Sequence, residues 1–99
     1  MDIRLRKAPC GFLSTNDEGK IVEVNETFLR WISYTEQQLL GQHVEMLLSP
    51  TNKLMFHSYF YPTIQLKNIV EEFFLSMRDS NKKSVPFLMN AKRYMRDGE

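Results

Sequence analysis

Apolar and polar positions near the start of the chain predict a β-hairpin. Residues 11–15 and 20–25 are short stretches that suit strands, and the second contains the β-branched Ile21, Val22 and Val24. Between them, residues 16–19 read Asn-Asp-Glu-Gly, and Asn, Asp and Gly tolerate the positive φ angles of a tight turn. We therefore expect two antiparallel strands joined at residues 16–19.

Two short helices are predicted after the hairpin from their start and stop signals. Asn25 can cap the first helix, in which apolar residues recur at helical spacing over residues 28–32. Thr35 and Gln38 have the spacing of a capping box, and Gly41 suits the end of that second helix. Helices this short are marginal on their own, so packing must hold them.

A longer helix is predicted to begin with Ser49 as its cap and Pro50 as its first residue. A short apolar turn over residues 44–48 precedes it. Pro62 has no backbone N–H and its ring clashes with the preceding turn of a helix. We therefore expect this helix to bend or stop just before Pro62, and residues 63–68 to be less helical.

The last third of the chain alternates as two longer strands, residues 70–78 and 85–95. In the first, Phe73 lies on the face opposite Phe74. In the second, Phe87 and Met89 lie on the face opposite Leu88. The order of strands, short helices and strands predicts an α+β architecture, an antiparallel sheet with short helices packed on one face.

Composition and charge exclude several classes of protein. Ninety-nine residues, 42% of them hydrophobic, suit one small domain with a real core. Thirteen Lys and Arg against twelve Asp and Glu give a net charge of +1, which does not favour nucleic acid as a partner. No apolar run approaches the ~20 residues that span a bilayer, and no export signal is visible, so we expect no membrane insertion.

The single cysteine indicates the cellular location, and the lack of catalytic motifs indicates whether the chain acts as an enzyme. Cys10 cannot form an internal disulfide, so we predict a reducing, cytoplasmic location and a small buried side chain at this position. No nucleophile elbow, phosphate-cradling loop or metal-spaced set of His and Cys is present. The chain is therefore not expected to be an enzyme by itself.

An ordered set of short motifs resembles the PAS sensor domain. The residues that carry this resemblance are Gly11–Ile21, Val24–Phe28, Trp31–Tyr34 with Glu36, Leu39–Gly41, and the pair of strands around Arg78–Asp79 and Val85–Pro86. Ala8–Leu13, Gly41–His43, Tyr59–Pro62 and Val85–Ala91 are most similar to the PAS module that precedes a serine phosphatase in Bacillus energy-stress signalling proteins.

The resemblance implies a single sensor domain over residues 1–99, with residues 1–7 as an N-terminal segment. It also implies a five-stranded antiparallel sheet in spatial order 2-1-5-4-3, with the helices enclosing a small cavity against it. Residues for the fifth, central strand would have to follow Glu99. We therefore expect the chain to be a truncated piece of a longer polypeptide, with the gap filled by a partner chain or left as an open edge.

Apolar residues on the predicted inner faces are the candidates for the cavity wall. They are Phe28, Trp31, Ile32, Leu40, Leu47, Met55, Phe56, Phe87 and Met89. The alternative is that they simply fill the core. Met side chains repack readily, so a small apolar or aromatic ligand could be admitted, although the identity of any cofactor is unknown.

His57 lies in the region from which haem-binding members of the family present an axial ligand. It would ligate haem only if haem is bound, and the alternative is an ordinary exposed or core histidine. His43 is expected to be a surface or capping residue. The flavin photosensing branch uses a reactive cysteine between its central helices, and this sequence has none there.

The outward face of the sheet is the predicted dimer face. Its candidate residues are Phe74, Leu88 and Tyr94, with Ile3 and Leu5 of the N-terminal segment as additional cover. We therefore expect a homodimeric module that senses a signal and regulates a C-terminal output domain: a serine phosphatase, a diguanylate cyclase or a histidine kinase. The alternatives are a ligand-free protein-interaction module and a haem-based gas sensor.

Overall fold

The computed structural model describes residues 2–93, and its N-terminal part contains the predicted hairpin. A short helix, α1 (Ile3–Arg6), precedes strands β1 (Leu13–Thr15) and β2 (Ile21–Val24). The strands pair antiparallel, with Leu13 opposite Val24. Gly19 in the turn has a φ of 80°, a conformation that glycine adopts without strain because it has no Cβ.

Three short helical segments follow, and their caps confirm the predicted start signals. Helix α2 (Glu26–Ile32) is capped by Asn25, whose side chain accepts from the backbone N–H of Phe28. Helix α3 (Glu36–Leu39) has the complete capping box of Thr35 and Gln38. A 3₁₀ turn, η1 (Val44–Leu47), is capped by the side chain of His43, as expected for that residue.

The α-helix is interrupted before Pro62, as predicted, but the expectation that residues 63–68 are less helical was wrong. Helix α4 (Pro50–Met55) passes into a π-helical turn, η2 (Phe56–Phe60), and then into α5 (Tyr61–Lys67). The backbone N–H of Tyr61 donates to the carbonyl of Phe56, five residues back. The wide π turn ends directly before Pro62, which therefore lies in the first turn of α5, where its missing N–H costs little.

Two long strands complete the described chain. Strands β3 (Ile69–Arg78) and β4 (Ser84–Lys92) pair antiparallel, with Phe74 opposite Leu88. A β-bulge interrupts the register between Val70 and Phe73, and within it Glu72 has a φ of 53°. The backbone N–H of Glu72 donates to the side chain of Asn90 across the pair.

One hydrophobic core connects all these elements. Its buried members come from both hairpins, the helices and the turn before α4: Ile21, Val24, Phe28, Ile32, Leu39, Val44, Leu47, Leu48, Phe56, Phe60, Val70, Phe73, Leu75 and Met77. The alternation predicted for residues 73–77 is confirmed, since Phe73, Leu75 and Met77 are buried. Among residues 2–93, no helix is both long and apolar enough to cross a membrane.

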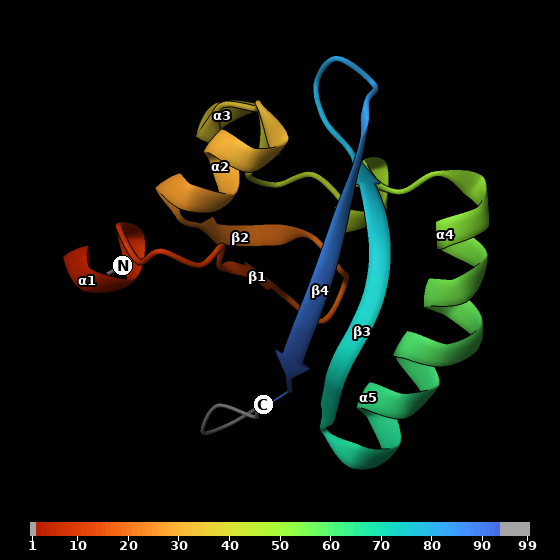
Figure 1. Ribbon diagram of the computed structural model, residues 1–99. Coiled ribbons are helices and arrows are strands. Elements are labelled where there is room, and N and C mark those ends of the chain that lie inside the picture. The colour runs from red at the N-terminus through yellow and green to blue at the C-terminus, as the bar shows by residue number, and fades with distance from the viewer. Residues whose placement is uncertain (1, 94–99) are drawn as a thin grey trace.

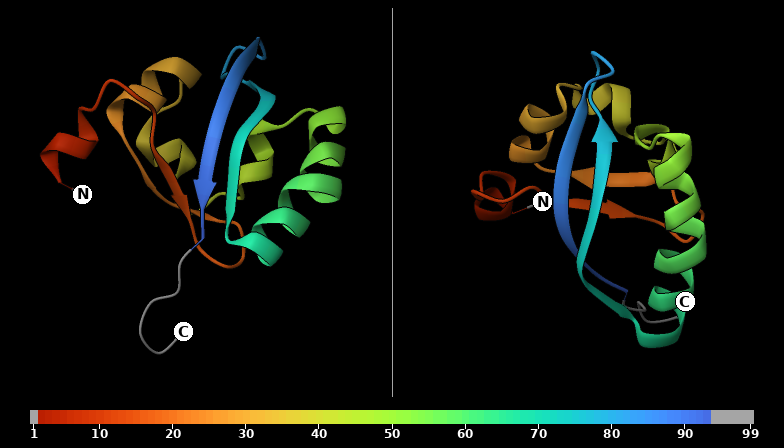
Figure 2. Two further views of the ribbon diagram at one scale, coloured as in Figure 1. Left: turned by 60° about the horizontal axis from the view of Figure 1, so that its bottom comes forward. Right: turned by 45° about the vertical axis from the view of Figure 1, so that its right-hand side comes forward.

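The two strand pairs form separate sheets in the described part of the chain. Strand β1 pairs only with β2, and β3 only with β4. Figure 1 shows β4 in front of the β1–β2 hairpin, with α4 and α5 beside β3 and with α2 and α3 near β2. The two further views in Figure 2 show the same arrangement from other sides. The α+β class is therefore confirmed, and within residues 2–93 no strand pairing joins β1 to β4.

Candidate functional site

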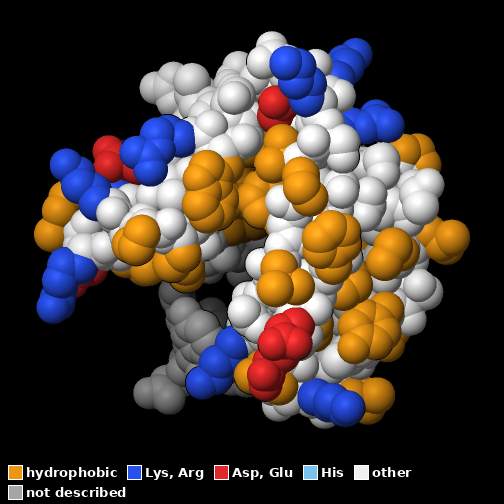
Figure 3. Space-filling view, viewed as in Figure 1, with side chains coloured by type: hydrophobic (Ala, Val, Ile, Leu, Met, Phe, Trp, Pro, Cys, Tyr) orange, Lys and Arg blue, Asp and Glu red, His pale blue; other side chains and the backbone are white. Residues whose placement is uncertain are grey.

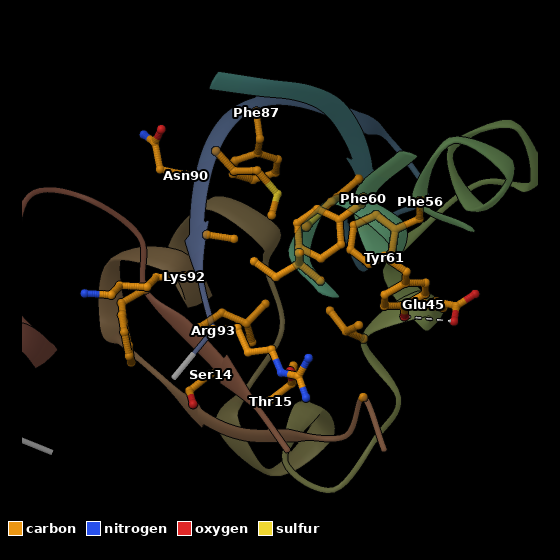
Figure 4. Close-up of a pocket in the computed structure, with 18 of the residues that line it drawn as sticks. Ser14, Thr15, Glu45, Phe56, Phe60, Tyr61, Phe87, Asn90, Lys92 and Arg93 are labelled. Carbon is orange, nitrogen blue, oxygen red and sulfur yellow. Dashed lines mark hydrogen bonds between the residues drawn. The ribbon is translucent and has the colours of Figure 1, made fainter. Parts of the chain in front are cut away.

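An open cleft of about 1700 Å³ lies between the β1–β2 hairpin, strand β4 and the long helix. Figure 4 shows Ser14 and Thr15 of the hairpin across from Asn90, Lys92 and Arg93 at the end of β4. This volume exceeds the ~300–1000 Å³ of common small-molecule pockets. The cleft therefore has room for more than a small ligand.

Three aromatic rings connect α2 to β4 at one side of the cleft. The centroid of the Phe87 ring lies 5.8 Å from that of Phe28 and 6.0 Å from that of Trp31. Trp31 also packs on Gly11, where an added Cβ would lie 2.9 Å from Cζ3 of the indole. Trp31 is 43% exposed, so this single tryptophan reports on both the cleft and solvent.

The opposite wall comes from the π turn and the start of α5. The rings of Phe56 and Phe60 stack with centroids 4.4 Å apart, and the Tyr61 ring meets Phe56 edge-on at 5.1 Å. Phe73 of β3 packs against the same pair of phenylalanines. The wall is therefore a compact aromatic cluster held between the helix and β3 (Figure 4).

One carboxylate provides a polar edge on this aromatic wall. Oε1 of Glu45 lies 2.7 Å from Nε2 of His57, and the Tyr61 hydroxyl donates to Oε2 at 3.2 Å. Burial raises the pKa of Glu45, but the hydrogen bonds from His57 and Tyr61 outweigh it, and the net pKa is lowered. Burial and the adjacent carboxylate raise the pKa of Tyr61 to about 12.

The structure places the predicted cavity residues in three different environments. Phe28, Trp31, Phe56, Phe87 and Met89 line the cleft. Ile32 and Leu47 are fully buried in the core and are not in its lining. Leu40 and Met55 are 40% and 41% exposed and also lie outside the lining.

His57 lines the cleft, but its geometry does not suit a haem ligand. Its side chain is 58% exposed, and Nε2, the nitrogen that would face an iron atom, is bonded to Glu45. Within residues 2–93, no group of three or more His, Cys, Asp or Glu side chains is arranged to hold a metal ion. With Nε2 hydrogen-bonded to Glu45 and the ring largely in solvent, His57 does not suit an axial haem ligand.

The prediction that Cys10 is buried was wrong, since the residue is exposed. Its backbone carbonyl accepts from Nδ2 of Asn25, which fixes the chain just before β1. That hydrogen bond holds the backbone at the rim of the cleft and leaves the thiol at the surface. Sequence hydrophobicity alone did not reveal this, because the constraint comes from a residue fifteen positions away.

The outward sheet face carries an exposed apolar pair. Phe74 and Leu88 are 61% and 64% exposed and lie directly opposite each other on β3 and β4. Figure 3 shows hydrophobic side chains gathered over this strand pair. Ile3 is 63% exposed and Leu5 is half-buried on α1, which lies near α2 and not over β3 and β4 (Figure 1). Tyr94 lies outside the described residues.

Sequence reasoning missed four residues that line the cleft from the long helix: Phe60, Tyr61, Ile64 and Gln65. All four lie within three positions of Pro62, and two of them fall in residues 63–68, which were expected to be less helical. The signal was the aromatic run Tyr59-Phe60-Tyr61, which is costly to leave in an irregular, solvated segment. Glu45 was missed because its two partners are 12 and 16 residues away.

The chain is similar to proteins of one family along nearly its whole length. It is 36% identical over 91 residues to the phosphoserine phosphatase RsbP of Bacillus subtilis, which covers 92% of this chain but only 23% of that protein. A PAS domain structure from Colwellia psychrerythraea has a TM-score of 0.77 at 17% identity, covering 84% of this chain and 70% of the other. The structure of RsLOV D109G has a TM-score of 0.72 at 20% identity, covering 85% and 50%. A family model described as PAS domain matches residues 9–99, and the chain therefore belongs to the PAS domain family.

Proposed function

We propose that the chain is a sensing and dimerising module that regulates an output domain on the same polypeptide. Two findings support the proposal. The chain belongs to the PAS family, and its match to RsbP, a protein named as a phosphatase, covers only 23% of that protein. The output domain would be a serine phosphatase, a diguanylate cyclase or a histidine kinase. The module itself would act in the cytoplasm and carry out no reaction.

The outward face of β3 and β4 would join two copies of the module. The observation that supports this is the exposed cross-strand pair Phe74–Leu88, because adjacent large apolar side chains in water favour a partner surface. In a two-fold dimer the same patch serves both copies. Since α1 does not lie over β3 and β4 of its own copy, Ile3 and Leu5 would add cover only between the two copies. Tyr94, the remaining candidate for this face, lies outside the described residues.

Sedimentation velocity of two matched variants tests this interface. Leu88→Asp places a charge in the proposed interface, and Leu66→Asp places the same charge on α5 at a site that is 83% exposed. We expect Leu88→Asp to shift the protein to monomer at concentrations at which the wild type and Leu66→Asp are dimers. Equal dimerisation of all three proteins would rule out this interface.

The cleft would hold the signal, a small apolar or aromatic molecule. Phe28, Trp31, Phe56, Phe87 and Met89 would contact it directly, because they line the cleft. The other predicted wall residues would support this wall indirectly. Two would do so from the core, Ile32 and Leu47, and two from exposed positions outside the lining, Leu40 and Met55. A ligand that binds one packing of the sheet and helices more tightly would shift the module towards that packing, and the dimer face would pass the change to the output domain.

A central strand from the segment that follows Glu99 would close the other side of the cleft. Both outer sheet edges are already covered: Ile21 exchanges hydrogen bonds with Gly41 and Gln42 beside β2, and Leu48 bridges Met77 beside β3. Among residues 2–93, no backbone hydrogen bond links β1 to β4 across the cleft. Two open inner edges that face one cleft suit a fifth strand, which would leave a smaller cavity beneath it.

Hydrogen exchange on a longer version of the polypeptide tests this strand. We expect amides of β4 that exchange rapidly in the 99-residue chain to be protected when the following segment is present. Equal exchange of residues 84–92 in the two proteins would exclude strand addition.

An absorption spectrum separates the haem-sensor alternative, since a Soret band would demonstrate bound haem. A ligand-free interaction module would show neither a Soret band nor a bound small molecule.

A further inference from the structure

Glu45 joins two parts of the molecule that are far apart in sequence. It lies in the 3₁₀ turn η1, and its side chain is 18% exposed. The carboxylate accepts from His57 in the π turn and from Tyr61 at the start of α5. Because both partners lie on the long helix, a single side chain attaches that helix to the turn.

The turn that carries Glu45 is itself attached to the β1–β2 hairpin. The backbone N–H of Val44 donates to the carbonyl of Gly19 at 2.9 Å, and His43 bridges Lys20. The His43 ring also packs against Gly19, where an added Cβ would lie 2.6 Å from Nε2. Nδ1 of His43 accepts from the backbone N–H of Glu45 at 3.1 Å. Glu45 therefore connects the hairpin wall of the cleft to its helical wall.

The helical wall needs such a connection because it contains the π turn. Phe56 and Phe60 lie within this turn, and the Tyr61 ring packs against both of them. A π turn is a rare interruption of an α-helix, and Pro62 leaves one fewer donor in the next turn. The two hydrogen bonds to Glu45 fix the side chains at positions 57 and 61, on either side of Phe60.

We propose that Glu45 is a positioning residue for the cleft: through His57 and Tyr61 it fixes the aromatic helical wall, and so determines how tightly an apolar molecule is held. Hydrogen bonds to a charged carboxylate are stronger than neutral ones, so removal of the charge loosens the wall. The biological meaning of this role rests on the proposed ligand cleft. The geometry of the wall can be tested without knowledge of the physiological ligand.

Hydrogen exchange with mass spectrometry is the first test, with Glu45→Gln and the matched control Glu18→Gln. Glu18 also lines the cleft, but its ion pair is with Lys20 in the hairpin and not with the helix. We expect Glu45→Gln to speed exchange at least threefold in residues 54–66 and to leave residues 26–32 unchanged. Exchange equal to that of Glu18→Gln, or an increase spread evenly over the whole chain, would overturn the proposal.

Binding of the apolar dye anilinonaphthalene sulfonate is the second test, and its pH profile separates positioning from simple stability. We expect the Kd of Glu45→Gln to differ at least threefold from that of the wild type. Glu36→Gln should leave the Kd unchanged, because the Glu36 carboxylate bonds Arg6 and lies outside the cleft lining. In the wild type, the Kd should shift as the pH falls below 4.5, the ordinary value for Glu, because Glu45 protonates there. Glu45→Gln should lack this step. An identical step in both proteins would overturn the proposal even if dimerisation or the physiological ligand proved different.

Discussion

Replacement of Asn25 by alanine should be one of the most damaging single changes in the chain. Asn25 is fully buried, and its side-chain amide makes four hydrogen bonds. Oδ1 accepts from the backbone N–H groups of Phe12 and Phe28, and Nδ2 donates to the carbonyls of Leu5 and Cys10. One side chain therefore attaches the N-terminal segment and the chain before β1 to the start of α2.

The magnitude follows from the groups that alanine leaves without a partner. Loss of a helix cap alone costs ~0.5–2 kcal/mol. The N–H of Phe12 and the carbonyls of Leu5 and Cys10 also lose a partner in a poorly solvated region, and each such bond is worth roughly 0.5–1.5 kcal/mol. The sum is about 2–6.5 kcal/mol, a large share of the ~5–15 kcal/mol that stabilises a domain of this size.

Urea denaturation of the wild type, Asn25→Ala and Asn25→Asp measures this loss. Aspartate keeps the two acceptor bonds but places a carboxylate oxygen against the carbonyls of Leu5 and Cys10, so we expect it to destabilise the fold as well. Asn81→Ala, in the exposed β3–β4 turn, is the matched control and should change stability by less than ~0.5 kcal/mol. Thermal melts should show a fall in Tm of more than about 10 °C for Asn25→Ala.

A loss below about 1 kcal/mol for Asn25→Ala would refute this reasoning. It would mean that water or a shifted backbone replaces the four bonds, and that the N-terminal segment is not held through α2. An equally large loss for Asn81→Ala would show instead that any asparagine replacement unfolds this marginal domain.

Three further changes follow from single residues. Gly19→Ala should cost about 1–2 kcal/mol in urea denaturation, because Gly19 has a positive φ and His43 leaves no room for a Cβ; a neutral effect would contradict the described turn. Glu72→Gly should stabilise the fold by about 0.5–1 kcal/mol because glycine relieves the positive φ, whereas Glu71→Gly should destabilise it; the reverse order would count against the bulge. Tyr61 should ionise near pH 12 in an absorbance titration, and Tyr61→Phe should remove that step. Because the pKa is raised above the ordinary 10, the stability that Tyr61 contributes is present below pH 10 and is lost as the pH rises towards 12.

Local signals in the sequence predicted the local structure well. The caps at Asn25, Thr35 and Ser49 depend on side chains that bond the backbone two or three residues ahead, and each helix begins where expected. The alternation around Phe74 and Leu88 likewise predicted the exposed pair, because a strand places successive side chains on opposite faces.

Features that depend on distant residues could not be predicted in this way. The π turn absorbs Pro62 because Phe56, Phe60 and Phe73 pack together, and packing outweighs a local helix-breaking preference. The Glu45 link to His57 and the exposure of Cys10 depend on partners more than ten positions away. The residues of a single sequence, taken alone, give no sign of such pairs.

Native mass spectrometry of the protein purified from cells tests the central claim, a dimeric sensory module with a ligand cleft, most directly. The account predicts a dimer that carries the added mass of a small organic molecule, and Trp31→Phe combined with Phe87→Ala should lose that mass because both residues line the cleft. A monomer with no bound molecule, over the concentration range at which the fold is intact, would contradict it.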